Sequence, residues 1–140
     1  MTHSWTLTDD LTRKLDDLVD RVTEAELAMV LSPDGLLLGT SRGVDQEVAE
    51  QVVCVAAGLQ GLALAAGRLT DNGGVQQIIV QMAEAYLFLA TTRGGALLAV
   101  RFTADAEIAD VAYEVALFAN QSHHDLPAEL ESAVRSPARD

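Results

Sequence analysis

Few side chains in this sequence are of the types that could perform chemistry. Cys54 is the single cysteine among 140 residues, and two of the three histidines, His123 and His124, are adjacent. Adjacent residues at a helix end point to different sides, so the two imidazoles do not match the ligand spacing of a zinc site. Cys54 lies in an apolar run without a neighbouring cation, which is typical of an inert thiol. We therefore predict no metal site.

Acidic and glycine-rich stretches also have plain interpretations. Asp16, Asp17 and Asp20 lack the loop spacing and the glycine of an EF-hand, so they are interpreted as a solvated helix face. Neither Gly73-Gly74 nor Gly94-Gly95 precedes Lys-Ser/Thr at a helix start, so neither is interpreted as a phosphate-binding loop. No nucleophile can be paired with a base. We predict no catalytic residues and no cofactor, and hence a protein that is not an enzyme.

Length indicates the number of domains, and net charge excludes some classes of binding partner. A chain of 140 residues is typical of one domain. Its 21 acidic and 9 basic side chains give a formal net charge of -12, which repels nucleic acid and anionic lipid headgroups. No signal peptide and no uninterrupted apolar run of spanning length is visible, so membrane insertion is not expected. One cysteine gives no reason to expect an oxidising compartment, and we expect a cytoplasmic protein.

Apolar spacing and turn residues predict an α+β fold. Three helices are predicted: residues 9–23 with Thr8 or Asp9 as the cap, residues 45–69, and a last helix from a Thr103 cap to near Ser122. Five strands are predicted at 26–31, 36–41, 75–82, 86–92 and 96–102. The short turns favour a five-stranded antiparallel sheet in the order α-β-β-α-β-β-β-α, with the long helix on one face and the terminal helices on the other. Residues 1–8 are predicted to be a flexible N-terminus and 123–140 a short or mobile tail, leaving 9–122 as the domain. Gly39 indicates a bulge or a close backbone approach.

The long central helix carries more apolar surface than one sheet face can cover. One row at alternating steps of four and three is Val48, Val52, Val55, Leu59, Leu62, Ala66 and Leu69, and a neighbouring row of small residues is Cys54, Gly58, Gly61 and Ala65. Glycine inside a helix costs roughly 1 kcal/mol relative to alanine, so two within one turn favour close approach of another backbone. The simplest partner is a second copy, with a dimer interface formed by Val48, Val52, Cys54, Val55, Gly58, Leu59, Gly61, Leu62 and Ala65. The alternative is that the terminal segments cover this helix within one chain.

Particular core and turn residues resemble a known family. They are Pro33-Asp34-Gly35-Leu36 at the first hairpin, Tyr86-Leu87-Phe88-Leu89 followed by Gly94-Gly95-Ala96-Leu97-Leu98-Ala99-Val100, and Ala109-Asp110-Val111-Ala112-Tyr113-Glu114. The pattern resembles the Roadblock / dynein light-chain family over about residues 9–122. It is most similar to small stand-alone bacterial members, which accompany a Ras-like GTPase of the gliding-motility type or occur in operons with a sensor-kinase-like protein.

The resemblance implies a homodimer in which two sheets join edge to edge and the long helices pair. Such a dimer would dock a Ras-like small GTPase and change its nucleotide hydrolysis or exchange in bacterial signalling or polarity. By analogy, Asp34, Glu47, Glu50 and Gln51 are candidate GTPase contacts. Arg42, Arg68 and Arg93 lie in predicted loops and could act as an arginine finger, but the family offers no motif for one, so salt-bridged or solvated arginines are expected.

A different class of function stays open from the residues alone. A five-stranded sheet faced by helices can enclose a small pocket, which would suit a small-ligand-sensing module. Gln77, Gln81 and Thr92 are the candidate polar groups of such a pocket. An enzyme is the least favoured class, because no acid-base pair can be named.

Overall fold

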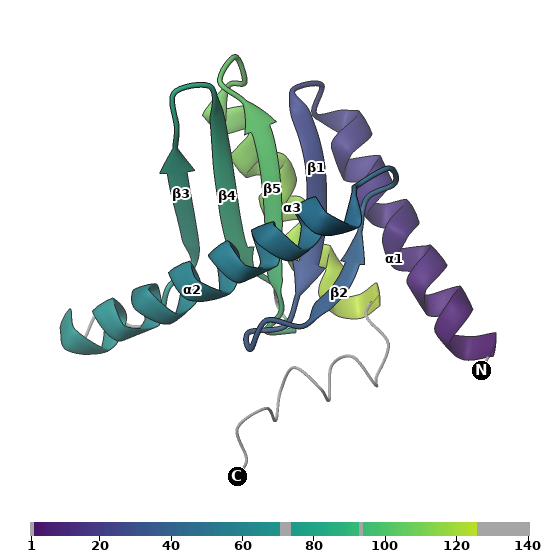
Figure 1. Cartoon of the computed structure of the whole chain (residues 1–140), viewed down its shortest axis with the longest axis horizontal. Helices are drawn as coiled ribbons and strands as arrows, with labels where there is room; N and C mark the ends of the chain where they lie inside the picture. The colour runs from purple at the N-terminus through teal and green to yellow at the C-terminus, as the bar shows by residue number, and fades with distance from the viewer. Residues whose placement is uncertain (1, 71–73, 93, 126–140) are drawn as a thin grey trace, which may run out of the picture.

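A computed structural model describes residues 2–70, 74–92 and 94–125, and its elements follow the predicted order (Figure 1). They are α1 (Thr2–Arg21), β1 (Ala25–Leu31), β2 (Leu37–Thr40), α2 (Gln46–Thr70), β3 (Gln77–Gln81), β4 (Ala85–Thr91), β5 (Leu97–Thr103) and α3 (Ile108–Asp125). The prediction of an α-β-β-α-β-β-β-α chain is therefore confirmed.

The five strands form one antiparallel sheet in the order β2-β1-β5-β4-β3. The first strand of the chain lies beside the last, with Ala28 opposite Val100 and Met29 opposite Ala99. This β1–β5 pairing joins the N-terminal hairpin to the C-terminal three-stranded meander. The sheet edges are β2 and β3.

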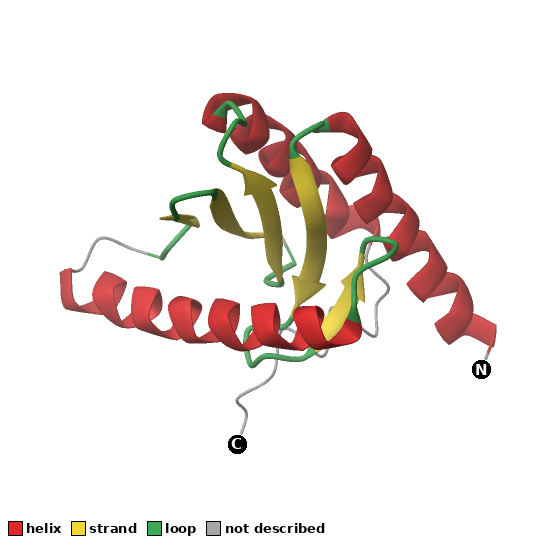
Figure 2. Ribbon diagram, turned by 45° about the horizontal axis from the view of Figure 1, so that its top comes forward, coloured by secondary structure: helices red, strands yellow, loops and turns green. Residues whose placement is uncertain are grey.

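Helices cover both faces of the sheet, as predicted. In β5, Leu98 and Val100 belong to a core shared with α1 and α3, whereas Leu97 and Ala99 belong to a second core shared with α2. Successive residues of a strand point to opposite faces, which is why one apolar strand serves both cores. Figures 1 and 2 show α2 crossing one face of the sheet, with α1 and α3 on the other.

Helix α1 buries the predicted stripe but begins earlier than predicted. Leu11, Leu15, Leu18 and Val22 are all buried, whereas the helix starts at Thr2, so Thr8 and Asp9 lie inside it and the predicted cap is wrong. Neither glycine nor proline interrupts the sequence before Asp9, so nothing in the covalent chain stops the helix there. That residues 1–8 are flexible stays a prediction.

Helix α3 starts later and ends later than predicted. Thr103 is the last residue of β5, and its carbonyl accepts the Ala106 N–H at 3.2 Å in a turn that precedes the helix. The Thr103 cap is therefore wrong. The helix continues to Asp125, so His123 and His124 lie within it, and the rest of the predicted tail falls outside the described residues.

The first hairpin brings β2 close to α1. The Ser32 N–H donates to the Leu36 carbonyl at 2.8 Å, and Gly35 takes φ 94°, a left-handed conformation that favours glycine. The pairing register of β1 and β2 shifts between Val30 and Leu31. A Cβ placed on Gly39 would lie 2.6 Å from Leu11 Cδ2. The predicted close approach at Gly39 is thus confirmed, and it is the approach of β2 to α1.

Replacing Gly39 by alanine is expected to destabilise the fold. The added methyl would displace the buried Leu11 side chain, and overpacking of this kind lowers the free energy of unfolding by about 1–3 kcal/mol. Chemical denaturation measures the change. Gly74→Ala is the matched control, because a Cβ there meets nothing within 4 Å. Equal unfolding midpoints for the two variants would contradict the packing described.

Candidate interaction surface

Helix α2 packs on the sheet through Ala49, Val53 and Ala56, part of a buried row that the sequence patterns above did not single out. Ala49, Val53, Ala56 and Gln60 are buried at steps of four, three and four. Val48, Val52 and Leu59, from the predicted apolar row, are half-buried beside them. Alanine side chains let a helix lie close to a sheet. The row that contains Ala49 and Ala56 therefore faces the sheet, and the larger residues of the predicted row lie at its sides. This row has the same spacing of four, three and four as the predicted row, and that spacing is the sequence signal by which it could have been found.

The other side of α2 is apolar and uncovered by the described chain. We call Cys54, Val55, Gly58, Gly61, Leu62, Ala66 and Leu69 the outer α2 face, and all seven are exposed. A Cβ added at Gly58 or Gly61 would meet nothing within 4 Å. The two glycines therefore do not serve a close approach within the described chain. Of the nine residues predicted for the dimer interface, five lie on this face, and Val48, Val52, Leu59 and Ala65 flank it half-buried.

The C-terminal end of α2 extends past the sheet. A helix of 25 residues is about 37 Å long, whereas five strands span about 24 Å. Figure 1 shows α2 crossing the strands and continuing beyond β3. Leu62 and Leu69, in the C-terminal half of α2, are 73% and 87% exposed. A large apolar surface thus stands beside the sheet edge.

Length and apolar composition alone would also allow Gln46–Leu69 to cross a membrane, and 11% of its apolar window is buried. A single such helix is weak evidence for insertion, because helices of protein cores pass the same test. In this chain, Ala49, Val53 and Ala56 pack against the sheet. The packing gives the apolar composition a role within the domain.

Strand β3 presents an open edge next to the overhang. Within the described chain, β3 pairs with β4 on one side and no strand lies beyond it. Ile79, at the middle of this edge strand, is 40% exposed. Unpaired N–H and C=O groups on an edge can pair with a strand of another chain. The β3 edge and the α2 overhang lie at the same side of the molecule (Figure 1).

The four predicted GTPase contacts are all exposed. Glu47, Glu50 and Gln51 occupy the first turns of α2, and Asp34 lies at the tip of the first hairpin. That tip reaches α2, because a Cβ on Gly35 would lie 3.6 Å from Ala57 Cβ. Leu36, beside the tip, is 60% exposed and adds apolar surface. The hairpin and α2 therefore form neighbouring parts of one surface.

Several arginines are paired with carboxylates at separate places on the molecule. Arg42 forms an ion pair with Asp16, 2.8 Å between Nη2 and Oδ2, so the salt-bridged arginine expected there is confirmed. Arg68 is exposed in the last turn of α2, not in a loop, and Arg93 lies outside the described residues. Sequence patterns missed Arg101, whose Nε lies 3.2 Å from Glu26 Oε1, because it stands within a strand.

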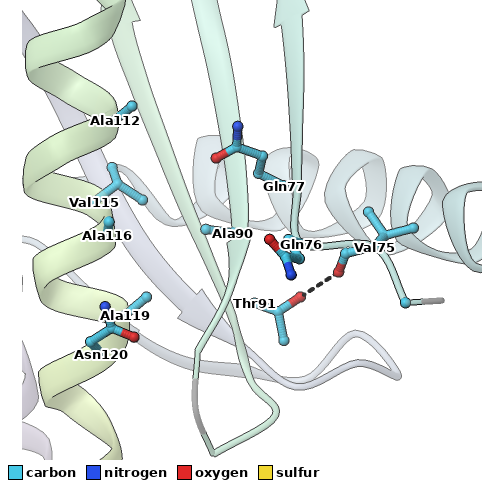
Figure 3. Close-up of a pocket in the computed structure, with 11 residues that line it drawn as sticks. Val75, Gln76, Gln77, Ala90, Thr91, Ala112, Val115, Ala116, Ala119 and Asn120 are labelled. Carbon is cyan, nitrogen blue, oxygen red and sulfur yellow. Dashed lines mark hydrogen bonds between the residues drawn. The ribbon is translucent and has the colours of Figure 1, made fainter. Parts of the chain in front are cut away.

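A cleft of about 540 Å³ lies between α3 and the β3–β4 side of the sheet (Figure 3). Gln76, Gln77 and Asn120 bring amides to it, and alanines of α3 and β4 form much of its wall. Of the three polar groups predicted for a ligand pocket, Gln77 alone lines this cleft. The buried Thr92 hydroxyl instead accepts the Ala96 N–H at 3.1 Å, and Gln81 is exposed outside the cleft. Among the described residues there is no group of three or more His, Cys, Asp or Glu that could hold a metal ion.

The sequence and the fold match known proteins. The Roadblock/LC7 domain family matches residues 11–102, and the chain belongs to this family. The Roadblock/LC7 domain from Streptomyces avermitilis is 32% identical, with a TM-score of 0.76 over 81% of this chain and 94% of that one. No curated protein sequence matches significantly.

Two more distant structures share the fold. The gliding protein MglB from Thermus thermophilus is 15% identical, with a TM-score of 0.75 over 85% of this chain and 90% of that one. MglB from Myxococcus xanthus is 14% identical, with a TM-score of 0.72 over 88% and 96%. The predicted family and fold are therefore confirmed.

Substitutions on opposite sides of α2 test which row contacts the sheet. Val53→Asn places an amide in the core and is expected to lower the free energy of unfolding by about 2–4 kcal/mol. Leu69→Asn, on the same helix but exposed in the single chain, should change the free energy of unfolding of the monomer by less than about 0.5 kcal/mol. Denaturation is measured at two protein concentrations, because a contribution from self-association depends on concentration. The assignment of the inner row is wrong if Leu69→Asn proves the more damaging at both.

Proposed function

We propose that this chain is a non-enzymatic, homodimeric regulator or scaffold that binds a Ras-like small GTPase in the bacterial cytoplasm. The dimer would modulate the nucleotide cycle of that GTPase in a signalling or polarity system. The observation that carries the proposal is the outer α2 face, an exposed apolar surface that projects past an open sheet edge. Membership of the Roadblock/LC7 family and the fold shared with the gliding protein MglB support it.

The dimer follows from the cost of leaving the outer α2 face in water. Covering Leu62 or Leu69 fully would contribute roughly 1.5–3 kcal/mol for each side chain. A second copy joined through β3 would extend the sheet under the overhang of α2 and pair the open strand edge. Gly58 and Gly61 would let the two α2 helices approach closely, since nothing of the described chain lies there. One symmetric contact would cover both exposed features.

The regulator would act without chemistry of its own. The partner GTPase supplies the nucleotide site, and the dimer biases the switch loops through contacts with Asp34, Glu47, Glu50 and Gln51. All four side chains are exposed, three on α2 and Asp34 on the neighbouring hairpin. Figure 2 shows α2 on the side of the sheet away from α1 and α3. A sensor-kinase-like protein from the same operon is a further proposed partner.

The proposed dimer predicts a mass of about twice 14.9 kDa by light scattering at micromolar concentration. Gly58→Leu or Gly61→Leu should lower the mass toward that of a monomer, because a leucine would hold the paired helices apart. Tyr113→Ala, at an exposed position on α3, is the control and should keep the dimer. A wild-type protein that stays monomeric under these conditions would refute the dimer.

Cysteine labelling gives a second readout of the same contact. Cys54 is exposed in the single chain, so its maleimide labelling should be slow in the dimer and fast after dilution or in Gly61→Leu. Equal labelling rates in the wild type and in Gly61→Leu would place Cys54 outside any dimer interface.

GTPase binding is tested by mixing the protein with a co-encoded Ras-like GTPase in its GDP and GTP states. We expect the dissociation constant to depend on the nucleotide. Glu47→Lys combined with Glu50→Lys should weaken binding by about tenfold or more, since reversed charges oppose an interface arranged for carboxylates. Asp20→Lys, an exposed position on α1, is the matched control. Absence of binding in both nucleotide states would remove the proposed function.

A further inference from the structure

One carboxylate of the α1 layer holds the segment that leads into α2. Asp16 Oδ1 accepts the backbone N–H of Arg42 at 2.6 Å, and Oδ2 lies 2.8 Å from Nη2 of the same arginine. Oδ2 is buried and meets the guanidinium as an ion pair, without an aligned hydrogen bond. Arg42 belongs to the connection 41–45 between β2 and α2. Asp16 therefore joins a helix on one face of the sheet to the connection that leads into the helix on the other.

The rest of this connection is also held in place. Ser41 is buried, its N–H donates to the Ala28 carbonyl at 2.8 Å, and its Oγ accepts the Ala28 N–H at 3.1 Å. Gly43 takes φ 79°, the left-handed conformation that lets the chain turn away from the sheet edge. The Ala49 N–H then donates to the Asp45 carbonyl at 2.9 Å at the start of α2. After Ser41, the connection is thus anchored from outside by the Asp16 side chain.

This arrangement leaves the side chain of Arg42 exposed to solvent. Its side chain is 81% exposed, while that of Asp16 is 13% exposed, so the ion pair has one buried and one open end. Bonds that involve charged groups and partly buried carboxylates are stronger than neutral surface contacts. The guanidinium is thus held at the surface a few residues before Glu47 and Glu50.

We propose that Asp16 is a positioning residue that sets the first turn of α2 and the direction of Arg42, and so controls GTPase binding at Glu47, Glu50 and Gln51. For the GTPase, this inference rests on the proposed function. Disturbance of α1 on one face of the sheet would reach the GTPase-binding surface on the other through this carboxylate. An ion pair that served stability alone would leave the affinity of the folded protein for the GTPase unchanged.

Hydrogen exchange of the full chain tests the positioning role directly. Asp16→Ala removes both contacts and should accelerate amide exchange in residues 42–50 on the order of tenfold, with the dimer mass unchanged. Asp16→Asn keeps an acceptor for the Arg42 N–H and should have a smaller effect. Asp17→Asn, the adjacent exposed carboxylate, is the control. Exchange in Asp16→Ala that matches Asp17→Asn, or that rises evenly over the whole chain, would overturn the proposal.

Affinity for the GTPase separates positioning from stability. Asp16→Ala and Arg42→Ala should both weaken binding severalfold, whereas Arg42→Lys, which keeps a cation for Asp16, should retain most of the affinity. Local acceleration of exchange with an unchanged dissociation constant would overturn the control of binding. If the wild type binds no GTPase in either nucleotide state, the proposed function fails with the claim of control, while the exchange experiment still decides whether Asp16 positions α2.

Discussion

A helix of 25 residues lies across a sheet of five strands, and this mismatch of length governs the molecule. The sheet can cover one row of α2 over part of its length, which accounts for the buried Ala49, Val53 and Ala56 and for the exposed Leu62 and Leu69. The other two helices cannot remedy this, because α1 and α3 pack on the opposite face. The apolar excess of α2 is therefore built into the topology.

Much of the fold could be predicted because hydrophobic period and turn chemistry act locally. The turn at Ser32 to Gly35, the buried stripe of α1 and the two-faced strand β5 follow from residue types and spacing. Helix ends could not be predicted as well. The start at Thr2 and the turn between Thr103 and Ile108 depend on the absence of breakers and on how the chain passes from strand to helix, which single residues do not mark.

The surface was predicted less completely than the fold. Apolar rows on a helix repeat at the same spacing, so sequence patterns identified an excess but not which row faces the sheet. The outcome depends on side-chain size, since alanines allow the close approach that larger residues prevent. The Asp16–Arg42 contact was missed because the two residues are 26 positions apart. The interpretation of Asp16 as part of a solvated helix face is wrong, since its side chain is 13% exposed and pairs with Arg42.

Because α1 and α3 pack on the same face of the sheet, this domain can be joined to others from one side. Helices α1 and α3, which lead to the two chain ends, both lie behind the sheet, on the side away from α2 (Figure 2). A domain or label attached at the start of α1 or directly after α3 would thus begin on the side of the sheet away from α2. The face that carries α2 would stay accessible, so the domain could be attached to another protein segment and bind a partner at the same time.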